Sequence, residues 1–113
     1  MTQAKLEGLL KIDNESYNLL RVLTMFMKLD NSQDVPLQAM AVFWYVATYQ
    51  NCTKKDIEKY FDMSKASASR MTDYISRYHR LGKAGLGLVS KEQDPKDKRR
   101  TLLKLTRKGK DLI

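Results

Sequence analysis

The chain has 113 residues, with 21 basic and 13 acidic side chains and a formal net charge of +8. This length suits one domain, so we expect residues 1–113 to form a single domain. The sequence has no signal peptide and no apolar run near the roughly 20 residues of a membrane span. The only cysteine, Cys52, excludes an internal disulfide and suits a reducing compartment. We therefore expect a cytoplasmic protein without a membrane partner.

The charge is distributed unevenly along the chain. Residues 1–63 hold 7 basic and 8 acidic side chains, whereas residues 64–110 hold 14 basic and 4 acidic ones. A basic half beside a nearly neutral half is typical of proteins that bind a polyanion. Lipid headgroups are one such polyanion, but the basic half lacks a long amphipathic helix with a broad apolar face. The charge pattern therefore favours nucleic acid.

Two helices are predicted in the first half of the chain. Residues 1–14 are weakly patterned, and we expect an N-terminal arm there. Residues 15–29 predict a helix with an apolar stripe formed by Leu19, Val22, Leu23, Phe26 and Leu29. Leu20 and Met27 widen its apolar surface, which indicates either a subunit contact or a second intramolecular contact.

The next helix is predicted to be central. Pro36 suits a first helical turn, and residues 37–49 are apolar almost all round. We expect Phe43, Trp44 and Tyr45 to lie in the core rather than to stack on bases, because they lie outside the basic half.

Residues 53–79 predict two helices joined by a tight turn. Thr53 is a good N-cap, and Asp56 stands where its side chain can reach back to that cap. Ile57, Tyr60 and Phe61 then recur at helical spacing. Residues 62–63 break the pattern, and Ser64 is the N-cap candidate of a second helix.

The second of these helices has two different sides. At about 100° per residue, one side carries small or apolar side chains and the other mostly polar ones. The first side holds Ala68, Met71, Thr72, Ile75 and His79, and the second holds Ala66, Arg70, Asp73 and Arg77. A packed back, an accessible front and a slim N-terminal end are features of a DNA-binding helix-turn-helix. An ordinary helical hairpin fits this stretch equally well by itself.

A β-hairpin is predicted directly after the two helices, over residues 86–105. Residues 86–92 and 99–105 predict its strands, and a polar turn with Pro95 joins them. Thr106 is expected to cap a short last helix. A basic hairpin can be a solvated surface loop, but one that follows a helix-turn-helix indicates a winged helix. The predicted fold class is mainly α with a small β-hairpin wing, a winged helix-turn-helix.

Two segments resemble a known family. DPKDKRRTLLKLTRKG (residues 94–109) is similar to the wing signature of MarR-type winged-helix regulators, and MSKASASRMTDYISR (residues 63–77) is similar to their recognition helix. The resemblance covers roughly residues 15–113. It implies a homodimer on a pseudo-palindromic duplex, with Lys96 at the minor groove where the family usually has arginine. It also implies that Asp94 orients Lys96 and that Arg99 pairs with a carboxylate or a phosphate.

The chain departs from the family pattern in two further places. Family members usually continue after the Leu-Thr-x-x-Gly segment into a long dimerisation helix, whereas this sequence ends four residues after Gly109. A glycine-rich insertion at residues 81–87 lengthens the link to the wing. We expect no small-molecule effector, and we expect residues 1–14 and 15–29 to supply the dimer contact.

These patterns predict a sequence-specific regulator of transcription that binds double-stranded DNA. Arg70, Ser67 and Ser69 are expected at or near bases, and the other basic residues are expected at phosphates. The predicted DNA-binding set is Ser64, Lys65, Ser67, Ser69, Arg70, Arg77, Lys96, Lys98, Arg99 and Arg100. Asp94 and Asp97 are expected to structure the wing. Such a role makes the transcription machinery a further candidate partner.

Two other classes of function are alternatives to this one. A winged helix can serve as a protein-interaction or architectural module with non-specific DNA binding, as in a mobile element or virus. An enzyme finds little support, because the chain lacks a glycine-rich phosphate loop and metal-spaced histidines or cysteines. We expect no cofactor and no metal. The lone His79 indicates a packed or capping residue, and Cys52 an inert side chain rather than a redox sensor.

Overall fold

The computed structural model describes residues 14–29, 35–76 and 85–113. The chain divides into two compact units, residues 1–34 and 35–113, and each is described by itself. The N-terminal arm predicted at residues 1–14 lies almost wholly outside the described residues. The single domain over residues 1–113 stays a prediction.

The first unit contains helix α2 (Asn14–Met27). It begins and ends within two residues of the predicted bounds. Its apolar stripe is narrower than predicted, because only Val22 and Phe26 are buried. Leu19 is 54% exposed, and the two off-stripe residues Leu20 and Met27 are also exposed. These three apolar side chains of α2 are therefore exposed in the described part of the structure.

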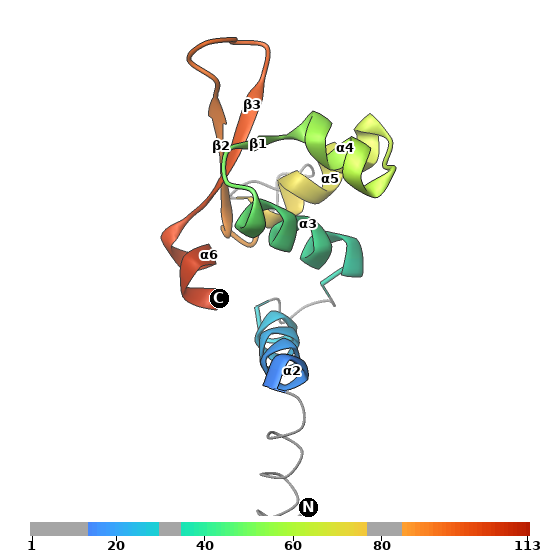
Figure 1. Cartoon of the computed structure of the whole chain (residues 1–113), viewed down its shortest axis with the longest axis vertical. Coiled ribbons are helices and arrows are strands. Elements are labelled where there is room, and N and C mark those ends of the chain that lie inside the picture. Colours follow the sequence, from blue (N-terminus) through green and yellow to red (C-terminus); the bar gives the residue numbers. More distant parts are fainter. Residues whose placement is uncertain (1–13, 30–34, 77–84) are drawn as a thin grey trace, which may run out of the picture. The chain divides into compact units, whose positions relative to one another are not determined.

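The second unit is a winged helix-turn-helix (Figure 1). Its elements follow the order α3 (Leu37–Thr48), β1 (Cys52–Thr53), α4 (Lys54–Phe61), α5 (Lys65–Ile75), β2 (Val89–Gln93), β3 (Thr101–Leu105) and α6 (Arg107–Leu112). The predicted fold class, mainly α with a small β-hairpin wing, is confirmed.

Helix α3 supplies the centre of the core, as its all-round apolar sequence predicts. It packs against α5 and β3, and its fully buried side chains are Ala39, Val42, Phe43 and Val46. The prediction that Trp44 and Tyr45 are core residues is wrong, since both are only half-buried. Tyr45 instead joins a cluster of rings with Tyr49, Tyr60 and Phe61, with centroids 4.9–5.8 Å apart.

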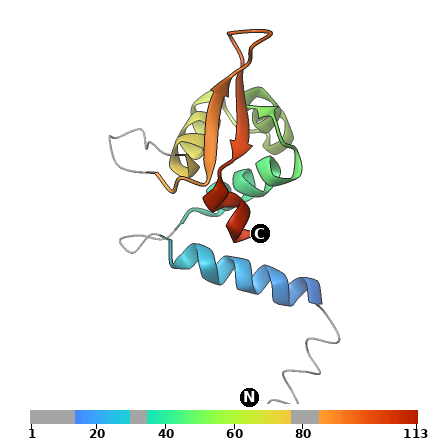
Figure 2. The same cartoon turned by 90° about the vertical axis from the view of Figure 1, so that its left-hand side faces the viewer.

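The three strands form one antiparallel sheet in the order β1-β3-β2. Val89 pairs with Leu105 and Gln93 with Thr101, so the hairpin is in register along its whole length. The hairpin loop projects past α4 and α5, while α6 lies at the opposite end of the hairpin (Figure 2). Strand β1, where Cys52 pairs with Leu103, was not predicted.

The hairpin strands are shorter than predicted for a clear reason. The first strand was predicted from Leu86, but the backbone N–H groups of residues 86–88 donate to carbonyls at the end of α5. Leu86 donates to Tyr74 at 2.9 Å and Leu88 to Ile75 at 2.8 Å. The second strand was predicted from Arg99, but Arg100 N–H donates to the Asp97 carbonyl inside the loop, at 3.0 Å. These backbone N–H groups therefore cannot form the hydrogen bonds that would extend the pairing of β2 with β3.

Candidate nucleic-acid interface

The helix-turn-helix is defined at both of its helix starts by side-chain caps. In α4, the Thr53 N–H donates to Asp56 Oδ2 at 2.9 Å and the Asp56 N–H donates to Thr53 Oγ1 at 3.2 Å, which forms the predicted capping box. Asp62 ends α4 in the left-handed region, with φ of 53°. Ser64 then caps α5 by accepting the Ser67 N–H at 3.1 Å. The turn between the helices is thus only residues 62–64.

The outer side of α5 is polar over its first two turns. Ser64, Lys65 and Arg70 are exposed, while Ser67 and Ser69 are half-buried. Arg70 Nη2 donates to Ser67 Oγ at 3.2 Å, and Ser64 Oγ donates to the same oxygen at 3.1 Å. The inward side is buried, with Ala68, Thr72 and Ile75 fully covered. Arg77 and His79 lie outside the described residues.

Asp73 departs from the exposed polar side on which the sequence placed it. Its carboxylate forms an ion pair with Lys91 of β2. Both side chains are about three-quarters buried, since 28% and 25% of their surfaces remain exposed. The pair joins α5 to the first wing strand. No local pattern predicts this pair, because the two residues are 18 positions apart on different elements.

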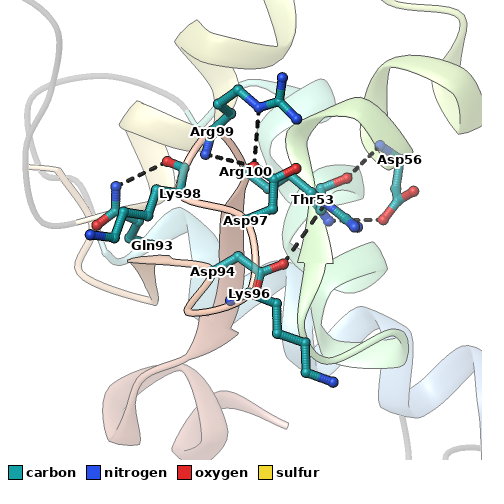
Figure 3. A network of polar contacts seen from close by, with 9 residues as sticks. All are labelled: Thr53, Asp56, Gln93, Asp94, Lys96, Asp97, Lys98, Arg99 and Arg100. Carbon is teal, nitrogen blue, oxygen red and sulfur yellow. Dashed lines mark hydrogen bonds and ion pairs between the residues drawn. The ribbon is translucent and has the colours of Figure 1, made fainter.

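Asp94 organises the start of the wing loop (Figure 3). Its Oδ1 accepts the Lys96 backbone N–H at 2.9 Å, and its Oδ2 lies 4.0 Å from Arg100 Nε. The Asp94 N–H donates to the Arg100 carbonyl at 3.0 Å and closes the loop. Figure 3 shows the Lys96 side chain extending away from the carboxylate. The side-chain partner of Asp94 is therefore Arg100, whereas the resemblance implied Lys96.

Asp97 organises the end of the same loop. Its Oδ1 accepts the backbone N–H of Arg99 at 3.1 Å and the side-chain Nε at 3.2 Å. The hydrogen bond from the Arg99 side chain holds the pKa of Asp97 below its usual value. Arg99 remains 91% exposed in this arrangement. Gln93 Nε2 donates to the Lys98 carbonyl at 2.9 Å, so backbone and carboxylates together fix the loop that carries the cations.

A cleft of about 760 Å³ lies between α4 and the wing loop. Its cationic lining comes from three elements, namely Lys54, Lys55 and Lys59 of α4, Lys65 of α5, and Arg99 and Arg100 of the wing. Asp56, Glu58 and Asp97 add three carboxylates. The predicted DNA-binding set omits the three α4 lysines, because they fall in the half of the chain that is nearly neutral as a whole. The spacing of Lys55 and Lys59, four positions apart on α4, is the sequence pattern that would have indicated a cationic face.

The thiol of Cys52 is not among the groups that line the cleft. Cys52 is buried, and burial together with the neighbouring Asp56 raises the pKa of its thiol to about 11. A protonated thiol is a poor nucleophile and a poor redox sensor. No set of three metal-ligating side chains occurs among the described residues. None of the helices in the described ranges has the length and apolarity of a membrane span.

Comparison with known proteins finds likeness in solved structures alone. No family model matches the chain, and no curated protein matches it. The crystal structure of MarR matches with a TM-score of 0.60 at 22% identity, over 95% of this chain and 69% of that one. The S. aureus MepR–DNA complex matches with a TM-score of 0.62 at 19% identity, over 96% and 76%. Streptococcus pneumoniae FabT in complex with DNA matches with a TM-score of 0.60 at 18% identity, over 97% and 69%. The resemblance to MarR-type proteins is confirmed at the level of the fold.

Proposed function

We propose that this chain is a transcriptional regulator that binds a specific site in double-stranded DNA. The observation that carries the proposal is that the start of α5 and the tip of the wing share one face. Lys65, Arg99 and Arg100 line the same cleft. Two of the similar structures, MepR and FabT, were solved with DNA. The shared fold supports the same use of α5 and the wing in this chain.

In this proposal α5 enters the major groove by its N-terminal end. Arg70 is the base reader, because its guanidinium is exposed and its fork can donate two hydrogen bonds to guanine. The hydrogen bond to Ser67 limits the freedom of the Arg70 side chain before DNA binds. Ser67 and Ser69 are short enough to let the helix approach base edges. In this assignment, the contact of Arg70 with bases in the major groove gives DNA binding its sequence preference.

The basic wing binds the DNA backbone and the adjacent minor groove. Arg99 and Arg100 are exposed and are positioned by Asp97 and Asp94. The other proposed phosphate contacts are Ser64, Lys65, Lys96 and Lys98, together with Arg77 beyond the described residues. Contacts with phosphates release counterions, so binding weakens steeply as salt rises. The wing therefore contributes affinity more than sequence preference.

We extend the proposal to a homodimer that acts in the cytoplasm. The support is the apolar surface of α2, where Leu20 is 63% and Met27 76% exposed. An exposed apolar patch of this kind marks a contact surface. A dimer would present two α5 helices to a pseudo-palindromic site. A dimer bound at such a site would then control the access of the transcription machinery to the neighbouring DNA.

Selection of bound duplexes from a random library tests this function. The parent chain is expected to enrich one palindromic sequence, and Arg70→Ala is expected to bind with little preference between that sequence and others. The mass of the complex in solution is recorded alongside and is expected to be that of a dimer. Salt-sensitive binding without any enriched sequence would refute specific regulation and indicate an architectural module.

A further inference from the structure

The cleft between α4 and the wing is lined by cations that the proposed DNA contacts do not use. Its volume of about 760 Å³ is in the range of pockets that hold small molecules. Six cationic side chains and three carboxylates line it. The α4 wall is the unexplained part, because neither base reading by α5 nor wing contact involves Lys54, Lys55 or Lys59.

The three carboxylates of the cleft leave its cations largely uncompensated. Asp56 is engaged in the capping box and Asp97 bonds to Arg99. Glu58 is left to offset a single charge. Among the described residues, Lys54, Lys55 and Lys59 form no ion pair with any carboxylate. The α4 wall therefore carries an excess of positive charge toward solvent.

The positions of Lys54 and Lys55 work against α4, whereas Lys59 stands in its last turn, where a cation is favourable to the helix dipole. Lys54 and Lys55 are the first two residues of α4, at the positive end of the helix dipole, where cations are unfavourable. Lys55 and Lys59 are exposed and stand at i and i+4, where like charges repel each other. Charges that oppose local stability and have no structural partner indicate a ligand that compensates them.

We propose that this cleft is a binding site for consecutive phosphate groups, held between the α4 lysines and the wing arginines. Lys55 and Lys59 form one wall and Arg99 and Arg100 the other, so a run of phosphates meets cations on both sides. Arginine forks suit phosphate oxygens in pairs, and lysines act as point charges. The phosphates come either from the backbone of duplex DNA, a source that rests on the function proposed above, or from a free polyphosphate anion.

The test uses the full chain and the double variant Lys55→Gln/Lys59→Gln. The change removes a repulsive pair on an exposed face, so α4 is expected to stay folded, as thermal unfolding will show. Lys59→Gln alone is the second variant, should the double variant lose stability. Arg107→Gln/Lys110→Gln is the matched control, because it removes two exposed charges from α6, outside the cleft. The two probes are inorganic triphosphate, by calorimetry, and a random-sequence duplex, by fluorescence anisotropy.

Two outcomes support the site and identify the source of its phosphates. If the cleft holds DNA, the double variant binds the duplex about 30-fold more weakly in 0.15 M salt, and triphosphate displaces the duplex. If the cleft holds a free polyphosphate, the double variant loses triphosphate binding while its duplex affinity matches that of the control.

Equal behaviour of the double variant and the control toward both probes would overturn the proposal. That result leaves the function proposed above intact as long as the parent chain binds its selected duplex. Conversely, a parent chain that binds no duplex refutes that function, and the triphosphate titration still decides whether the cleft binds phosphates.

Discussion

Removal of the two wing arginines is expected to lower the salt dependence of DNA binding by a defined amount. Arg99 is 91% and Arg100 56% exposed, and each is positioned by a carboxylate of the loop. In Arg99→Gln/Arg100→Gln, two phosphate contacts are lost. Each contact contributes about 0.9 to the slope of log K against log salt, so the slope should fall by about 1.8. In 0.15 M salt, this corresponds to roughly 30-fold weaker binding.

The assay is fluorescence anisotropy of a labelled duplex over a series of salt concentrations. The sequence preference of the variant should be unchanged, because Arg70 is left in place. Arg107→Gln/Lys110→Gln again serves as the control with the same loss of charge. A slope that stays at the parent value in the wing variant would refute the reasoning, and so would an equal fall in the control.

Two further predictions concern stability and the thiol. Thr53→Ala removes one half of the capping box with Asp56 and should lower the free energy of unfolding by about 1 kcal/mol in urea titration; an unchanged midpoint would contradict the role of the cap. The pKa of the Cys52 thiol is raised to about 11, so the thiol stays protonated near pH 8. Iodoacetamide should therefore modify the folded chain far more slowly than the chain in urea, and equal rates would count against a buried, protonated thiol. The raised pKa also stabilises the fold below about pH 9, and this contribution should be lost as the pH rises toward 11.

The sequence was informative wherever structure depends on neighbouring residues. The N-caps Thr53, Ser64 and Thr106 were all predicted, and each accepts a backbone N–H three residues on. A helix cap is a hydrogen bond between residues that are close in sequence, so a few neighbouring residues are enough to predict it. The order of helix pair and hairpin then led to the winged-helix fold, because few folds place a charged hairpin directly after such a pair.

The sequence was uninformative wherever structure depends on distant residues. Strand β1 has two residues, too few for any periodicity, and its partner strand lies about 50 positions away. The ion pair between Asp73 and Lys91 likewise required the fold to be known. The half-burial of Trp44 and Tyr45 shows the same limit, since an apolar sequence does not say which sides of a helix are covered.

The cationic cleft was missed for another reason. The summed charge of residues 1–63 is close to zero, and this sum concealed Lys54, Lys55 and Lys59 on one short helix. The wing arginines were found because they are clustered in sequence as well as in space. Local clustering of charge on a face, rather than its sum over a segment, determines what an anion meets.

Strand β1 has a consequence for how such a protein can change over time. Cys52 and Thr53 pair with Leu103 and Leu102, and Thr53 is also the N-cap of α4. One peptide segment thus connects strand β3 of the wing to the helix pair, at residues that lie outside the loop at residues 94–100. Residues 94–100 take part neither in this pairing nor in the β2–β3 ladder, so substitutions or insertions among them change none of the paired residues. The tip of the wing can therefore acquire a new length or charge in a single step, while the frame that holds the recognition helix keeps its geometry.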